Sequence, residues 1–160
     1  MRRGWLALLG AVLVGSLAAQ SPWLEAYRVV CERWEVPEEA EAYLAFVQTA
    51  DASELSPEEV TAFRAAAEMI HANHGWNPLE QWNVFVTWRD ALEAAIESSP
   101  QAPNLRLVRY GIQSSAPKFL GYRNELDSDR KLCLKALRDG FWSHSIEFEA
   151  FVEKTFAATP

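Results

Sequence analysis

The most distinctive set of side chains able to carry charge or to contact a ligand lies in the C-terminal half of the chain. Arg106 and Arg109 stand three positions apart, so a helix would place both guanidinium groups on nearly one face. Tyr122 and Asp129 follow after a proline-bounded break. An antiparallel neighbouring helix could bring Asp129 to Arg109. These four residues form the candidate site that the sequence offers.

Two interpretations of this set are open. Arginine and tyrosine commonly anchor interfaces, so the four residues could form a recognition patch on the surface. Alternatively, a buried Arg–Asp pair and the Tyr122 ring could fix the bend between two helical hairpins, and the sequence favours this structural role. Removing one partner of a buried pair costs about 3–5 kcal/mol. Arg109→Ala would then unfold the protein before it revealed a binding defect.

A second set of possible ligands is Glu68, His71 and His74, which a helix would place at intervals of three. A stable zinc site needs three or four ligands and supporting hydrogen bonds. The spacing also differs from the HExxH motif of zinc proteases. Both histidines precede Gly75, in a last helical turn where the helix dipole favours histidine. We therefore expect no metal and no cofactor, and keep metal or small-ligand binding through His71 and His74 as the alternative function.

Seven tryptophans are many for 160 residues. Trp76, Trp82 and Trp88 occupy neighbouring turns and could line an aromatic groove for a peptide or a sugar. The average burial of tryptophan favours bulky filling between helices instead. The sequence contains no phosphate-binding loop, paired-cysteine metal motif or haem-attachment motif. We therefore expect no catalytic residues and no enzymatic activity.

Helix-start signals and apolar spacing predict an all-α fold. Ser56-Pro57-Glu58-Glu59 is a capping box with proline at the first helical position, and Asn77-Pro78 repeats the same logic. Apolar residues recur every three or four positions, as on one face of a helix. The expected helices are 22–34, 37–50, 56–74, 77–98, 102–115, 124–138 and 143–157. Short links predict seven antiparallel helices in an α-solenoid-like, tetratricopeptide-like stack without a strict 34-residue period.

The pattern around the candidate site extends over a longer stretch. It comprises Arg106, Arg109, Ile112-Gln113, Pro117, Phe119-Leu120, Gly121-Tyr122 and Asp129. This stretch resembles a family of small exported bacterial helical proteins with tetratricopeptide-like packing, most of them uncharacterised. Trp76-Asn77-Pro78 and Leu92–Ile96 also resemble that family, and the resemblance covers about residues 22–140. It implies an all-α fold, export and no known enzymatic role, and it transfers no catalytic residue.

The N-terminus has the pattern of a secretory signal peptide. Arg2 and Arg3 precede the uncharged run Trp5–Leu17, and small residues follow at Ala18 and Ala19. The run is shorter than the roughly 20 residues that a membrane-spanning helix needs. Cleavage after Ala18 or Ala19 fits the pattern, and an uncleaved N-terminal anchor is the competing interpretation.

Processing defines the expected domain organisation. Residues 1–19 would be the signal peptide, and 20–160 a single helical domain without a membrane span. The chain has 15 Lys+Arg against 22 Asp+Glu, and its net charge of −7 becomes −9 when the two N-terminal arginines are removed. This acidic balance argues against binding to nucleic acid, which usually requires a basic surface.

Export would place Cys31 and Cys133 in an oxidising compartment, where a disulfide can form. Two buried free thiols are the alternative. A disulfide needs the two Cα atoms within about 7 Å of each other. Cys31 and Cys133 lie on expected helices that are two hairpins apart, and an open stack would hold those helices too far apart for a bridge. We expect a bridge only if the stack curls shut. Together these features predict a periplasmic or secreted, non-enzymatic protein that presents a groove to a protein or peptide partner.

Overall fold

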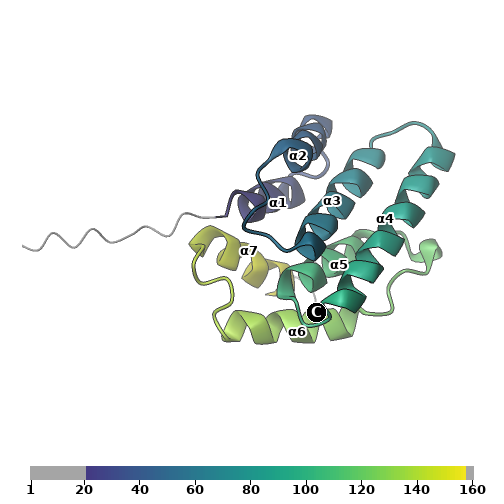
Figure 1. The fold of residues 1–160 in the computed structure, drawn as a ribbon. Coiled ribbons are helices and arrows are strands. Elements are labelled where there is room, and N and C mark those ends of the chain that lie inside the picture. Colours follow the sequence, from purple (N-terminus) through teal and green to yellow (C-terminus); the bar gives the residue numbers. More distant parts are fainter. Residues whose placement is uncertain (1–20, 158–160) are drawn as a thin grey trace, which may run out of the picture.

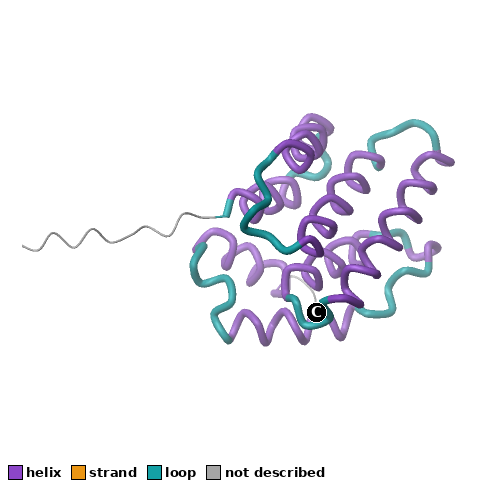
Figure 2. The backbone as a smooth tube through the Cα atoms, in the orientation of Figure 1, coloured by secondary structure: helices purple, strands orange, loops and turns teal. Residues whose placement is uncertain are grey.

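A computed structural model describes residues 21–157. These residues form seven α-helices and one short 3-10 helix, and they contain no strand (Figures 1 and 2). The elements are α1 (Pro22–Glu32), α2 (Pro37–Thr49), α3 (Pro57–Ala72), α4 (Pro78–Ser98), α5 (Pro103–Ser115), η1 (Lys118–Leu120), α6 (Leu126–Arg138) and α7 (Ile146–Ala157). The predicted all-α fold with seven helices is confirmed.

Local chemistry sets the helix starts. Each of the first five helices has proline at its first position, where the missing N–H costs no intrahelical hydrogen bond. The capping box is present: Ser56 Oγ accepts from Glu59 N, and the Glu59 carboxylate accepts from Ser56 N. Asn77 Oδ1 accepts from Leu79 N at 3.0 Å at the start of α4. These starts agree with the predicted ones within one residue.

The last two helices start later than predicted. Leu126 begins α6 and Ile146 begins α7, against predicted starts at 124 and 143. Gly140 has a φ of 75° and ends α6 with a hydrogen bond from Phe141 N to Ala136 O. A series of turns follows before α7 begins. Helix α7 begins only after Ser145, whose Oγ accepts from Phe148 N at 3.4 Å.

The helices pack as neighbours along the chain, with α3 at the centre. Helix α3 contacts α2, α4 and α5, and α5 in turn packs against α6. Helix α7 contacts both α6 and α1, so the last helix returns to the first (Figure 1). The described chain thus closes on itself, and the solenoid arrangement stays a prediction.

Two tryptophans anchor the closed core. Trp23 is buried against Phe63 and donates from Nε1 to Asp51 O at 2.9 Å. Trp142, in the link between α6 and α7, donates from Nε1 to Asn104 Oδ1 at 2.8 Å. Both indoles therefore satisfy their polar atom inside an apolar environment, as buried tryptophan usually must.

Both cysteines are free thiols. Burial raises the pKa of Cys31 and that of Cys133 to about 12. Burial also raises the pKa of Tyr27 well above its ordinary value, and the neighbouring Cys31 and Cys133 raise it further. The closed arrangement thus brings both thiols near one tyrosine without joining them.

None of the described helices is both long enough and apolar enough to cross a bilayer. The predicted signal peptide, residues 1–19, lies outside the described residues.

Candidate functional site

Arg109 and Asp129 form the centre of a buried ionic cluster between α5 and α6. Arg109 donates from Nε to Asp129 Oδ2 at 2.7 Å and from Nη2 to Asp129 Oδ1 at 2.8 Å. The two side chains are 4% and 0% exposed. This is the two-point geometry in which a guanidinium binds a carboxylate most strongly. The predicted proximity of Arg109 and Asp129 is confirmed.

Arg106 joins the same carboxylate from the preceding turn of α5. Its Nη1 donates to Asp129 Oδ1 at 2.7 Å, and its Nε donates to Pro100 O at 3.0 Å. The side chain is 15% exposed. Asp129 therefore accepts three N–H groups from two arginines, and this compensates for the loss of solvation of its buried charge.

Glu93 on α4 connects the cluster to a third helix. Its Oε2 accepts from Arg109 Nη1 at 2.6 Å, and its Oε1 accepts from the Tyr122 hydroxyl. Sequence reasoning did not assign Glu93 to the site. The available signal was a single carboxylate within the otherwise apolar stretch Leu92–Ile96.

The protonation states follow from these contacts. Burial disfavours the charged form of Arg109, but the bonds to Asp129 and Glu93 outweigh it and raise the pKa of the guanidinium. Burial raises the pKa of Tyr122, and the hydrogen bond to Glu93 raises it further. Arg109 is thus a permanent cation and Tyr122 a neutral donor.

A second buried contact extends the cluster toward the start of α6. Gln113 is fully buried, and its Nε2 donates to Glu125 Oε2 at 2.7 Å. Its Oε1 has no hydrogen-bond partner within residues 21–157. Sequence reasoning placed Gln113 in the family pattern but gave it no contact.

The burial of the cluster favours the structural interpretation of the four predicted residues. Arg109 and Asp129 are enclosed by three helices, where neither side chain can reach a partner protein. Tyr122 and Glu93 attach the link between α5 and α6 to α4, because the tyrosine belongs to that link. The cluster fixes the position of this link rather than presenting charge to solvent.

Tyr122→Phe should lower the free energy of unfolding by about 1.5 kcal/mol, because it removes a hydrogen bond to a charged group. This loss lies at the lower end of the range for hydrogen bonds to charged groups, because the Glu93 side chain is 32% exposed and water can solvate it. Urea denaturation followed by circular dichroism measures it. Tyr110→Phe is the matched control, because the Tyr110 hydroxyl is buried and has no hydrogen-bond partner in the described chain. Equal losses in both variants would contradict the role given to Tyr122.

Exposed apolar side chains lie just before α4, on its first turns and in η1. Trp76 is fully exposed just before α4, and Phe119 is 86% exposed in η1. Leu79 and Trp82, on the first turns of α4, are also exposed. We call Trp76, Leu79, Trp82 and Phe119 the α4 apolar surface. The expected filling role is therefore wrong for Trp76 and Trp82, whereas Trp88 packs partly buried against the core.

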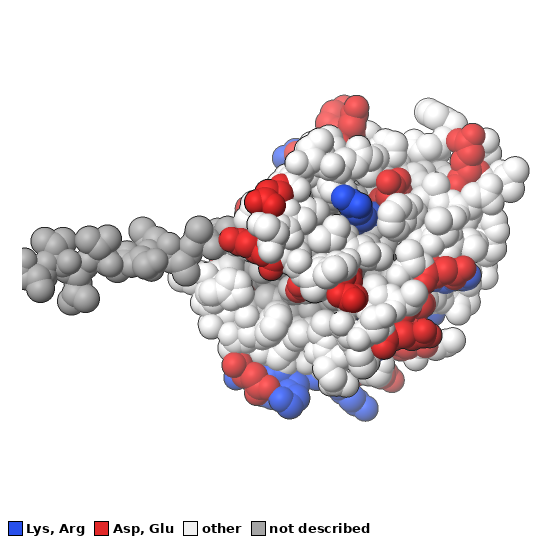
Figure 3. Space-filling model, viewed as in Figure 1, with Lys and Arg blue, Asp and Glu red and all other residues white. Residues whose placement is uncertain are grey.

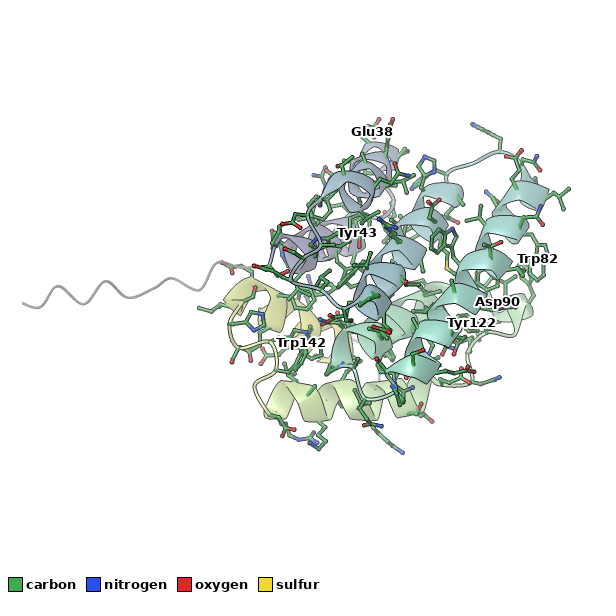
Figure 4. The ribbon with its side chains drawn as sticks, in the orientation of Figure 1. Glu38, Tyr43, Trp82, Asp90, Tyr122 and Trp142 are labelled. Atoms are coloured by element: carbon green, nitrogen blue, oxygen red, sulfur yellow. The ribbon has the colours of Figure 1, made fainter. Side chains whose placement is uncertain are left out.

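Aromatic contacts connect the buried cluster with the α4 apolar surface. The Tyr122 ring meets Phe85 edge-on with 5.8 Å between centroids, and Phe85 contacts Trp82 at 5.9 Å. Figure 4 shows Trp82 on the outer side of α4, with Tyr122 close to the same helix. The hydrogen bond from Tyr122 to Glu93 thus holds in place three contacting rings, those of Tyr122, Phe85 and Trp82, of which the last is exposed.

The predicted ligand residues Glu68, His71 and His74 all line one pocket of about 260 Å³ between the end of α3 and the start of α4. His74 Nε2 lies 2.9 Å from Trp34 O, a contact that holds the link between α1 and α2. Among residues 21–157, no three His, Cys, Asp or Glu side chains lie close enough together to hold a metal ion. The pocket brings the three residues together without giving them metal-binding geometry.

Comparisons with protein-family models, with curated proteins and with solved structures find no match to this chain. Membership of the exported helical family therefore stays a prediction, based on the pattern between Arg106 and Asp129. The function must be inferred from the site itself.

Proposed function

We propose that the protein is an exported, non-enzymatic interaction module of the cell envelope. It would bind a protein or peptide partner through the α4 apolar surface. The N-terminal pattern that predicts export supports the location, and the absence of a membrane-spanning helix from the described chain is compatible with it.

The exposure of the α4 apolar surface is the observation that carries the proposal. Single exposed apolar residues are ordinary, but Trp76, Leu79 and Trp82 fall within seven residues, and exposed apolar residues gathered in one place mark interaction sites. Three of the four members are aromatic, and aromatic residues anchor interfaces far more often than their abundance suggests. Trp76 has no packing role in the fold to explain its presence, because it is fully exposed.

The buried cluster supports the same proposal by making the surface rigid. Phe119 belongs to the link that Tyr122 attaches to α4, so the cluster holds both parts of the surface in one arrangement. A preorganised surface loses less conformational entropy on binding. The cluster is thus a positioning device for the α4 apolar surface.

The double variant Trp76→Ala and Leu79→Ala should raise the dissociation constant for the partner by about 30-fold or more, as expected for loss of an interface hot spot. The free energy of unfolding should change little, because both side chains are exposed. Surface plasmon resonance with the purified partner measures binding, and thermal unfolding checks the fold. Ile146→Ala is the control, since Ile146 is a comparably exposed apolar residue at the start of α7. A similar loss for both variants would contradict the proposed surface.

A further inference from the structure

We propose that the occupant of the α4 apolar surface is a basic amphipathic segment of another protein. Its apolar side chains would cover the surface, and its lysines or arginines would face acidic residues of α4. This inference rests on the proposed function and adds the chemistry of the partner.

Three exposed carboxylates lie along α4, one among its apolar residues and two beyond them toward the C-terminal end of the helix. Glu80 is adjacent to Leu79, and Asp90 and Glu97 follow on the exposed side of the same helix. At 1.5 Å per residue, the row extends over roughly 25 Å. Figure 4 shows Asp90 and Trp82 on the same outer side of α4. We call Glu80, Asp90 and Glu97 the α4 acidic row.

No lysine balances this row on α4. The single arginine of the helix, Arg89, is paired with Asp90 at 2.7 Å and lies over the Phe85 ring. Lys118, next to Phe119, adds one positive charge at the η1 end. The helix therefore presents excess negative charge along the length that a bound segment would follow.

The rest of the N-terminal region adds to the negative charge of α4. Residues 21–105, which include α1 to α4, contain fifteen acidic and four basic residues. On the face shown in Figure 3, acidic side chains lie over α2, α3 and α4, whereas basic ones gather mainly along the lower edge at α6. Such a field attracts a cationic partner and raises its association rate.

The same field disfavours the other occupants of an apolar surface. A second copy docking by two-fold symmetry would place one acidic row against the other, and like charges at an interface are destabilising. Anionic lipid would be repelled for the same reason. A basic segment is the occupant for which both the apolar and the charged parts of the surface are complementary.

Two synthetic amphipathic peptides of about five helical turns test this inference with the processed full-length chain. They share an apolar stripe of leucine and phenylalanine, and one carries lysine where the other carries glutamate. Fluorescence anisotropy should show at least ~10-fold tighter binding of the lysine peptide, with the preference falling as salt is added.

Charge-reversal variants locate the effect. Replacing the α4 acidic row by Glu80→Lys, Asp90→Lys and Glu97→Lys should weaken binding of the lysine peptide by ~10-fold or more and reverse the preference. The control variant Glu38→Lys, Glu41→Lys and Glu153→Lys changes the net charge equally on α2 and α7 and should retain the preference.

The outcomes separate this inference from the proposed function. Equal binding of both peptides, lost in the double variant of Trp76 and Leu79, would overturn the charge inference and leave the docking surface intact. Binding insensitive to Trp76 and Leu79 would overturn both. Failure of the lysine peptide to bind, equal weakening by the control variant, or dimerisation through the surface in sedimentation would also overturn the basic-segment inference.

Discussion

Asp129→Ala is expected to lower the free energy of unfolding by about 3–5 kcal/mol, the range for breaking one side of a buried ion pair. The substitution removes the acceptor of three N–H groups and leaves the Arg109 guanidinium buried with only Glu93 as its acidic partner. Urea denaturation at neutral pH, with the slope checked for two-state behaviour, measures the loss. It is the largest effect we expect from a single substitution in the cluster.

Asp127→Ala is the matched control, because Asp127 is exposed in the same first turn of α6. Its cost should stay within about 0.5 kcal/mol, as for most surface substitutions. A double-mutant cycle of Arg109→Ala with Asp129→Ala should show that the two losses are far from additive. A cost of Asp129→Ala no larger than that of Asp127→Ala would contradict the account of the cluster.

Raising the pH above about 9 is expected to destabilise the fold steeply. The thiol pKa values of Cys31 and Cys133 are about 12 in the folded state, against 9.0 when unperturbed. Between these values the unfolded state releases protons that the folded state retains, so the free energy of unfolding falls as pH rises. Each thiol contributes fully to the free energy of unfolding below pH 9. Between pH 9 and pH 12 that contribution falls by about 1.4 kcal/mol per pH unit.

The double variant Cys31→Ala and Cys133→Ala isolates this effect. Its free energy of unfolding should fall less steeply above pH 9, and the remaining slope should reflect buried tyrosines such as Tyr27 and Tyr43, whose pKa values are raised by burial. The thiols of the wild type should also react with Ellman's reagent only slowly unless the chain unfolds, since the thiolate is the reactive form. If the free energy of unfolding of the double variant fell as steeply with pH as that of the wild type, or if the folded wild type were labelled rapidly at pH 8, the role given to the buried thiols would be contradicted.

Helix positions could be predicted because their signals are local. A proline at the first helical position, a serine or asparagine cap and apolar spacing lie within a few residues of each boundary, as at Ser56-Pro57 and Asn77-Pro78. The Arg109–Asp129 pair could be anticipated because both residues lie on consecutive helices that had to be antiparallel. Both predictions required only short-range information.

The features that could not be predicted depend on which helix faces remain uncovered. Trp76 and Trp82 are large apolar residues of the kind that fill cores, but the link before α4 and the first turns of that helix leave them exposed. Glu93 enters the cluster only because α4 packs beside α5, and the approach of α7 to α1 is a long-range closure. Contacts between separate helices cannot be predicted from the apolar periodicity of any single segment.

Affinity purification of the tagged protein from its own envelope fraction, read by mass spectrometry of intact species, tests the central claim most directly. Wild type, the Ile146→Ala control and the double variant Trp76→Ala and Leu79→Ala are compared at equal yield. We predict a processed chain that brings one stoichiometric partner in the first two cases and none in the third. A wild-type chain that elutes alone, or a partner that the double variant retains, would contradict the claim that the α4 apolar surface is a docking site.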